Sequence, residues 1–251
     1  MDLKLEGRVA IVTGASRGLG RASVEALVAE GMKVIAAARS REDLDTLAKA
    51  HEGVVAVTCD VSDKTQVAGL VDAALEHFGD LHAVVNNAGI APAGNFLKDE
   101  DTIEVYEKVL AVNVIAPAVL SRAAARHYVS REGGGKIINI TSLSGLRGKP
   151  TLAAYSSSKG ALERQTEALA GEWAKLGIQV NAIAPGGFET DAQAAVFADP
   201  KILERRLRKI PVGRMGDAWE IGPLVAYLSS PLSNFVTGST FVIDGGEFHK
   251  L

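Results

Sequence analysis

The sequence predicts an α/β fold, namely a single-domain, Rossmann-like, doubly wound parallel sheet of about seven strands flanked by helices. Short apolar runs rich in Val, Ile and Ala alternate with longer helical patterns along the whole chain. The first run leads into a glycine-rich turn and then a helix. With 251 residues, 47% of them hydrophobic, and no linker, repeat or low-complexity tract, residues 1–251 fit one such domain.

Composition excludes several classes of protein. The net charge of -3 argues against a nucleic-acid or anionic-membrane partner. The start of the chain lacks a signal-peptide pattern, and no apolar run reaches membrane-spanning length. The single cysteine, Cys59, cannot form an internal disulfide and is expected in the core. We therefore expect a cytoplasmic enzyme or binding domain that acts on small molecules, without a metal site.

The first strand and the turn after it predict a phosphate-binding site. Arg8–Thr13 has the pattern of a buried strand, and a helical pattern runs to Glu30. Glycines between them allow a tight turn and let a pyrophosphate approach the helix N-terminus. Their spacing, G-x-x-x-G-x-G, differs from the usual G-x-G-x-x-G fingerprint. The turn residues expected at the ligand are Gly14, Ser16, Arg17, Gly18, Leu19 and Gly20.

The second strand, Lys33–Ala38, indicates which dinucleotide binds. A carboxylate near this strand end would hold a ribose 2′-hydroxyl, but the chain has Ala38 followed by Arg39. Together with Arg17, this suits a 2′-phosphate, because guanidinium matches phosphate geometry. The alternative is that both arginines are solvated loop residues. We predict NADP(H).

The next elements continue the alternation. A helix is predicted over Arg41–His51, a third strand over Val54–Thr58, and a helix from an N-cap at Ser62 to Phe78. Asp60 and Val61 follow the third strand and are expected to contact an adenine edge.

A fourth strand, Ala83–Val85, leads into a polar turn with small residues. Those small residues would let the backbone pass close to a ribose, whereas ordinary turn chemistry is the alternative for the two asparagines. The turn comprises Asn86, Asn87, Ala88 and Gly89.

A long and possibly bent helical region is predicted over Asp101–Arg131. Asn113 interrupts its apolar stretch. A buried amide needs partners. A water-bridging role near a site and a plain structural hydrogen bond both remain open for it.

The stretch around Tyr155 carries the predicted chemistry. A strand, Lys136–Ile140, ends just before Ser142, and a helix begins near Ala153. Tyr155 and Lys159 are four residues apart, so they share one helix face. A cation about 4 Å away would lower a phenol pKa by up to about 3 units, which would make Tyr155 a general acid or base. A surface pair is the alternative for any isolated Tyr-x-x-x-Lys.

The last third of the chain predicts a sixth strand, Gln179–Ile183, and a seventh, Ser239–Ile243, with a helix over Asp217–Leu228 between them. Residues 186–210 have weaker core signals and are a candidate substrate lid. Basic residues in that segment are expected to form a solvated helix face: Arg205, Arg206, Arg208 and Lys209.

These motifs resemble the classical short-chain dehydrogenases/reductases over nearly the whole chain. The resemblance implies hydride transfer between a nicotinamide and a carbonyl or alcohol carbon, in a homotetramer or homodimer. It implies that Tyr155 transfers the proton, Lys159 holds the nicotinamide ribose and lowers the tyrosine pKa, Ser142 polarises the substrate oxygen, and Asn113 supports a relay water. The residues that carry the resemblance are Thr13-Gly14-x-x-x-Gly18-x-Gly20, Asn86-Asn87-Ala88-Gly89, Asn113, Ser142, Tyr155-x-x-x-Lys159, Pro185-Gly186 with Thr190, and Asp244-Gly245-Gly246.

The resemblance also places cofactor contacts at the end of the sixth strand. Pro185, Gly186, Thr190 and the backbone of Phe188 are expected at the nicotinamide end. Gly187 stands where many members have a bulky residue, which is expected to open the pocket there.

The loops that would line the pocket indicate the class of substrate. These are loops 91–96, 143–152 and 187–197, and they suggest a small or medium ketone, with a 3-oxoacyl thioester as the alternative. A catalytically silent NADP-binding regulator is the rival class, and an epimerase or dehydratase is a third. The side chains that motivate this prediction are Phe96, Leu146, Leu152, Phe188, Arg147 and Glu189.

Overall fold

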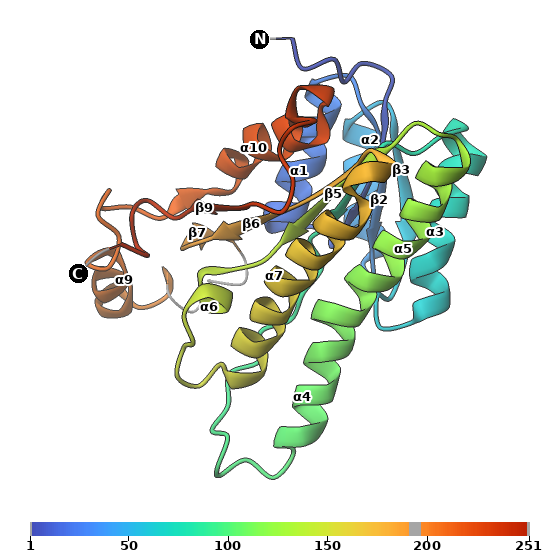
Figure 1. The fold of residues 1–251 in the computed structure, drawn as a ribbon. Coiled ribbons are helices and arrows are strands. Elements are labelled where there is room, and N and C mark those ends of the chain that lie inside the picture. Colours follow the sequence, from blue (N-terminus) through green and yellow to red (C-terminus); the bar gives the residue numbers. More distant parts are fainter. Residues whose placement is uncertain (1, 191–196, 250–251) are drawn as a thin grey trace.

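Seven parallel strands form the central sheet of the structure, a computed structural model that describes residues 2–190 and 197–249 (Figure 1). Their order is β3-β2-β1-β4-β5-β6-β9, and each neighbouring pair is parallel. This confirms the predicted fold. The strands are β1 (Val9–Thr13), β2 (Lys33–Ala38), β3 (Val54–Thr58), β4 (Ala83–Asn86), β5 (Gly135–Ile140), β6 (Ile178–Pro185) and β9 (Thr240–Ile243).

Helices cover both faces of the sheet. The helices α1 (Gly18–Ala29), α2 (Arg41–Ala50) and α10 (Gly222–Ser229) pack on one face. The helices α3 (Lys64–Phe78), α5 (Ala116–Ser130) and α7 (Ala153–Trp173) pack on the other (Figure 1). The sheet is therefore the middle of three layers.

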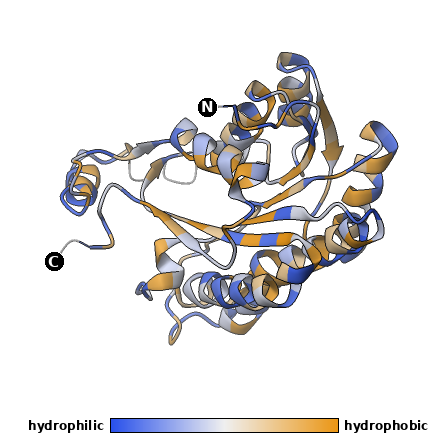
Figure 2. Cartoon of the chain, turned by 45° about the horizontal axis from the view of Figure 1, so that its top comes forward, coloured by the Kyte–Doolittle hydropathy of each residue, from blue (hydrophilic) through white to orange (hydrophobic). Residues whose placement is uncertain are grey.

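Alternation along the strands divides the core between these layers. In β2, Val34 and Ala36 pack toward α1 and α10, whereas Ile35 and Ala37 pack toward α3 and α5. Successive strand residues point to opposite faces, so a strand buried on both sides reads as one apolar run. The strands accordingly stand out as mostly hydrophobic in the middle of the molecule (Figure 2).

The predicted long helix is continuous, but its middle turn is π-helical and not α-helical. It begins as α4 (Thr102–Leu110), passes through a π-helical turn (Ala111–Ile115), and continues as α5. Asn113 lies inside the π-helical turn and is fully buried. Such turns re-aim side chains and are frequent at functional sites.

Four local predictions need correction. Asp63, not Ser62, caps α3, and its carboxylate accepts from the backbone of Thr65 at 2.8 Å and Gln66 at 3.2 Å. A short helix, α6 (Leu143–Leu146), lies in the predicted loop after β5. The last helix starts later than predicted, because a 3-10 turn (Ala218–Ile221) precedes α10.

The fourth correction concerns the candidate lid, which contains a short strand as well as the expected helix. The helix α9 (Pro200–Leu207) lies in it, and the two-residue strands β7 (Phe188–Glu189) and β8 (Gly216–Asp217) pair in parallel. Strands this short leave no periodic signal in the sequence. Residues 191–196 of the candidate lid lie outside the described residues.

None of the described helices combines the length and the apolar character needed to cross a membrane.

Candidate active site

The carboxyl ends of the parallel strands all lie at one edge of the sheet. The direction in which the strand order runs reverses between β1 and β4, and the helices that follow these two strands lie on opposite faces of the sheet. Open α/β sheets bind ligands in the crevice at such a point. The predicted site residues follow β1, β2, β3, β4, β5 and β6. The fold therefore brings the ends of distant segments to one region.

The glycine turn is held by hydrogen bonds from the segment after β4. The Thr13 hydroxyl oxygen accepts from the backbone nitrogens of Asn87 and Ala88, both at 3.1 Å. The Asn87 amide donates to the carbonyls of Thr13 at 2.9 Å and Gly14 at 3.2 Å. These bonds join two distant segments, so ordinary turn chemistry within the segment after β4 does not describe the Asn87 side chain.

The glycines are needed where the turn closes on itself. A Cβ on Gly20 would lie 2.2 Å from the Gly14 carbonyl oxygen, which is closer than any real contact. Gly14 and Gly18 have φ values of 65° and 53°, a region that favours glycine. A Cβ on Gly18 would lie 3.4 Å from Thr190, so the turn and the segment after β6 are neighbours. The glycines thus let the turn pack closely at the N-terminus of α1, as a phosphate-binding turn requires.

The end of β2 offers cations rather than a carboxylate of its own. Ala38 is buried, whereas Arg39 and Arg17 are exposed. The carboxyl of Asp60 has a lowered pKa, mainly because the backbone and the hydroxyl of Ser62 donate to it, with a smaller effect from Arg39. Two exposed guanidinium groups suit the binding of a 2′-phosphate. Arg39 also interacts electrostatically with the Asp60 carboxylate.

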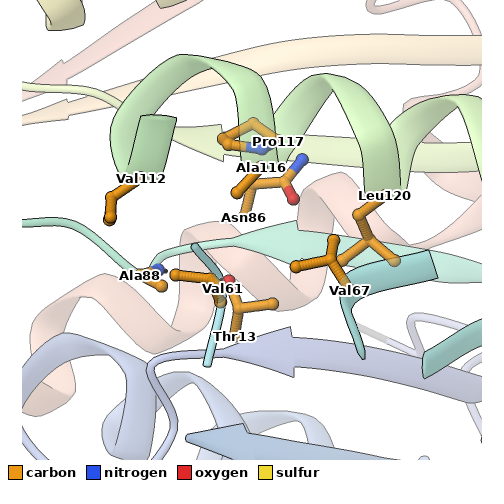
Figure 3. A pocket seen from close by; sticks show the side chains of 9 residues that line it. All are labelled: Thr13, Val61, Val67, Asn86, Ala88, Val112, Ala116, Pro117 and Leu120. Carbon is orange, nitrogen blue, oxygen red and sulfur yellow. Dashed lines mark hydrogen bonds between the residues drawn. The ribbon is translucent and has the colours of Figure 1, made fainter. Parts of the chain in front are cut away.

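A small, mostly apolar cavity lies beneath these strand ends (Figure 3). Val61 and Ala88, which come from the ends of β3 and β4, meet there. The structure thus brings together two of the predicted cofactor contacts. The remaining lining residues are Thr13, Val67, Asn86, Val112, Ala116, Pro117 and Leu120.

Tyr155 and Lys159 lie on the buried side of α7 beside the end of β5. The Lys159 side chain is 4% exposed and donates to the Ile140 carbonyl at 2.7 Å. Its ammonium lies 5.8 Å from the centroid of the Tyr155 ring. A Cβ on Gly89 would lie 3.3 Å from the Asn113 side-chain oxygen and 3.4 Å from that ammonium, so the segment after β4 passes close to Lys159. The surface-pair alternative is therefore wrong.

The predicted effect of Lys159 on Tyr155 does not appear in this structure. Burial raises the pKa of the Tyr155 phenol, and a hydrogen bond with Ser142 opposes this shift. Burial also lowers the pKa of Lys159 to about 8, while Glu163 acts in the opposite direction. The expectation of a lowered tyrosine pKa is corrected, because desolvation of the phenol outweighs the hydrogen bond with Ser142.

Asn113 is engaged with protein groups on three sides. Its side-chain oxygen accepts from the backbone nitrogen of Ile90 at 2.9 Å. Its amide nitrogen donates to the Ile90 carbonyl at 2.9 Å and to the Ser158 hydroxyl at 3.0 Å. Ser158 in turn donates to the Tyr155 carbonyl at 2.7 Å. Asn113 therefore ties the segment after β4 to the helix that carries Tyr155.

The end of β6 differs from the expectation of an open pocket. A Cβ on Gly187 would lie 2.6 Å from a guanidinium nitrogen of Arg206 and 2.9 Å from the Met215 sulfur. The space that Gly187 leaves is thus filled by these two side chains. Arg206 forms a bidentate ion pair with Glu247, and both side chains are less than one fifth exposed. Arg206 is therefore not part of a solvated face, unlike exposed Arg205 and Lys209.

The proposed pocket side chains lie in different environments. Phe188 is buried and its ring packs over Gly216. Phe96 is exposed and contacts Tyr106 edge to face. Arg147 donates to the Phe248 carbonyl at 2.9 Å, and its guanidinium lies over the Phe248 ring.

Sequence reasoning missed three residues that organise the site. Thr13 braces the glycine turn, Ser158 joins Asn113 to α7, and Arg206 fills the Gly187 space. The position of Ser158 directly before Lys159 on a buried helix face was the available signal. Neither of the other two contacts has a sequence signal, because their partners are distant in the chain.

Comparison with known proteins agrees with this geometry. A family profile described as "Enoyl-(Acyl carrier protein) reductase" matches residues 14–247. The chain is 38% identical over 247 residues to 3beta-hydroxysteroid dehydrogenase 1 from Eggerthella lenta, covering 96% of this chain and 94% of that protein. It is 37% identical over 246 residues to L-xylulose reductase from Bos taurus, covering 98% of each chain.

A solved structure is similar over the full length. It is a gluconate 5-dehydrogenase from Burkholderia cenocepacia J2315 in complex with NADP and tartrate, with a TM-score of 0.92 and 31% sequence identity, covering 100% of this chain and 98% of that chain. The glycine turn, the Ser142, Tyr155 and Lys159 group and these full-length matches agree. The chain belongs to the classical short-chain dehydrogenase/reductase family of NAD(P)-dependent oxidoreductases.

Proposed function

We propose that the protein is an NADPH-dependent ketone or carbonyl reductase, or the reverse alcohol dehydrogenase. The observation that carries this proposal is the meeting of Ser142, Tyr155 and Lys159 at the end of β5, close to Gly89 of the segment after β4. The fit to a dinucleotide is supported by the glycine turn, where no side chain could be added at Gly20. When bound, NADPH supplies the hydride.

The residues have distinct proposed roles in a reduction. The Tyr155 phenol donates its proton to the substrate oxygen, and the resulting phenolate is stabilised by the Lys159 ammonium. The Ser142 hydroxyl donates a hydrogen bond to that oxygen. Asn113 supports a relay water, although its position inside three hydrogen bonds also makes it a brace of the site.

The raised pKa of Tyr155 favours this direction of proton transfer. A buried phenol stays protonated at neutral pH, which is the form that an acid catalyst of reduction needs. In the reverse oxidation the same group would have to be deprotonated first.

The proposed cofactor contacts follow the strand ends. The turn after β1 would bind the pyrophosphate, Arg17 and Arg39 the 2′-phosphate, and Asp60 and Val61 the adenine. The ribose and nicotinamide contacts would be Asn87, Ala88, Gly89, Tyr155, Lys159, Pro185, Gly186, Phe188 and Thr190.

A small or medium ketone is the proposed substrate, and a 3-oxoacyl thioester is the alternative. The named relatives act on a steroid, a sugar and a sugar acid, so their names favour no single size of substrate. A screen of ketones, ketoses, keto acids and a 3-oxoacyl thioester, each with NADPH, tests the proposal through loss of NADPH absorbance. Binding of NADPH without turnover of any compound would instead indicate a silent regulator.

We also propose that residues 186–210 act as a substrate lid. Support comes from the position of α9, which lies beside the C-terminal segment and apart from the three layers (Figures 1 and 2). The Arg206–Glu247 ion pair and the pairing of β7 with β8 tie the described part of this segment to later residues of the chain.

A homotetramer or homodimer is proposed as the assembly. A groove between α5 and α7 is lined by apolar Val129, Leu169 and Trp173 and by Arg122 and Glu172. Apolar side chains together with charges of both signs suit a self-complementary interface between two copies related by a two-fold axis. Light scattering of the wild type and of Trp173→Asp tests this, since the variant should be smaller.

A further inference from the structure

Glu163 is a buried carboxylate one helical turn after Lys159 on α7. Its side chain is 1% exposed, and that of Lys159 is 4% exposed. Residues four apart in a helix share one face, so both side chains enter the interior between α7 and the sheet. Acidic side chains are almost never this buried without a compensating partner. Its burial therefore needs an explanation.

A hydrogen bond compensates the burial of only one of the two carboxylate oxygens of Glu163. The Thr240 hydroxyl, on β9, donates to Oε2 of Glu163. Oε1 has no hydrogen-bond partner among the described residues. A neutral glutamine could accept from Thr240 as well, without the cost of burying a charge. What distinguishes glutamate here is the charge itself.

The negative charge of Glu163 acts on the ammonium group of Lys159. Burial lowers the pKa of Lys159, and Glu163 raises it in partial compensation. The other groups that face the ammonium are uncharged, namely the Ile140 carbonyl on β5, Gly89 after β4 and the Asn113 amide of the π-helical turn. Tyr155, the remaining titratable neighbour, is on α7 itself.

The sheet sets the separation of the two charges. Lys159 is anchored at Ile140, which pairs with Ile183 of β6, whereas Glu163 is anchored at Thr240, which pairs with Ala182 of the same strand. The anchors are thus two strands apart, roughly 10 Å at the usual strand spacing. At an effective dielectric of about 20, such a pair changes a pKa by about one unit.

We propose that Glu163 is a positioning residue of the reaction, whose carboxylate, anchored on β9 by Thr240, holds Lys159 in its protonated form beside Tyr155. The proposal rests on the proposed function, because it matters only where Lys159 assists Tyr155. It extends the site from Ser142, Tyr155 and Lys159 to a fourth group, which lies one turn further along α7 on the side that faces the sheet.

The first test measures the pKa of Lys159 directly, by NMR titration of protein labelled with ¹³C at lysine Cε. The Lys159 signal is assigned by its absence in Lys159→Met. In Glu163→Gln the pKa should fall by about one unit, whereas Glu163→Asp, which keeps the charge, should retain most of the wild-type value. Glu167→Gln is the matched control, since Glu167 is exposed on the same helix and pairs with Arg164. No change is expected there.

The second test follows kcat/KM for reduction across pH. The alkaline fall in Glu163→Gln should move down by about one unit, with little change on the acidic plateau. A merely structural residue would lower the plateau instead, with no shift. An unchanged Lys159 pKa in a folded Glu163→Gln protein would overturn the proposal.

A measurement on the wild type keeps the proposal testable even if Glu163→Gln fails to fold. Titration of ¹³C-labelled glutamate measures whether Glu163 carries its charge while Lys159 titrates. A carboxyl that stays neutral while Lys159 titrates would also overturn the proposal. These titrations need no turnover, so they can be distinguished from a failure of the proposed reaction, which Tyr155→Phe tests.

Discussion

The side-chain nitrogen of Lys159 lies 2.7 Å from the carbonyl oxygen of Ile140, so the helix that carries Tyr155 is tied to the last residue of β5. Ser142 follows the same strand after one residue. One strand end therefore positions all three groups of the proposed reaction. The rigidity of this arrangement makes the effects of substitution specific.

Replacement of Tyr155 by phenylalanine should remove proton transfer and keep the ring. We expect turnover to fall on the order of 10²-fold or more, because positioned acid–base catalysis contributes about that much. NADPH affinity, measured by fluorescence titration, should change little. Tyr227→Phe, on α10 across the sheet, is the control and should behave as the wild type. Near-normal turnover in Tyr155→Phe would end the proposed mechanism.

Cofactor choice should depend on the end of β2. One hydrogen bond to a charged group contributes roughly 1.5–3 kcal/mol, which corresponds to a preference for NADPH of about 10- to 150-fold. The double variant Ala38→Asp with Arg39→Ser adds a repelling carboxylate and removes a cation, so it should favour NADH. The measurement is kcat/KM with each cofactor. A wild-type enzyme that prefers NADH would show that Arg17 and Arg39 do not bind the 2′-phosphate.

Binding of the cofactor should order the candidate lid. Hydrogen exchange in its described parts, residues 186–190 and 197–210, should slow on adding NADP(H), more than in Lys136–Ile140 of β5. Equal exchange with and without cofactor would rule out a cofactor-ordered lid.

The Arg206–Glu247 pair should hold the described part of that lid in place. Glu247→Gln weakens a mostly buried bidentate pair, so exchange in α9 should rise several-fold without cofactor. Arg205→Ala, at an exposed position on the same helix, is the control and should leave exchange in α9 unchanged. An identical exchange pattern in both variants would mean that the pair does not anchor α9.

His82 should make the fold sensitive to acid. Burial lowers the pKa of His82 from 6.5 to about 4, and its Nδ1 accepts from the Val9 backbone at 3.1 Å. Between these values the unfolded chain binds the proton and the folded chain does not, so the stabilisation is complete above pH 6.5 and is lost as pH falls toward 4. The loss amounts to roughly 2–3 kcal/mol by pH 4.5.

Urea unfolding at pH 7 and pH 4.5 measures this effect. In His82→Gln the fall in unfolding free energy should be smaller than in the wild type by that amount. His77→Gln, at an exposed position, should show the wild-type fall. An equal fall in all three proteins would assign the acid sensitivity to carboxylates such as Asp80.

The local pattern of the sequence determined the fold and the proposed chemistry. The apolar runs at β2 and β3 have the predicted boundaries, because apolar side chains of both strands pack against core clusters on both faces of the sheet. The glycine turn and the placement of Tyr155 and Lys159 on one helix face could likewise be predicted, because each depends on residues that are close in the chain. The site roles assigned to these residues stay predictions.

Tertiary structure decided what depends on residues far apart in the chain. The occupation of the Gly187 space by Arg206, the three hydrogen bonds of Asn113 and the anchoring of Glu163 by Thr240 join segments that no periodicity relates. The same holds for the direction of the Tyr155 pKa, which spacing alone predicted wrongly. A pKa depends on the solvent that folding removes as well as on the neighbouring charge, and only the packed structure shows how much solvent has gone.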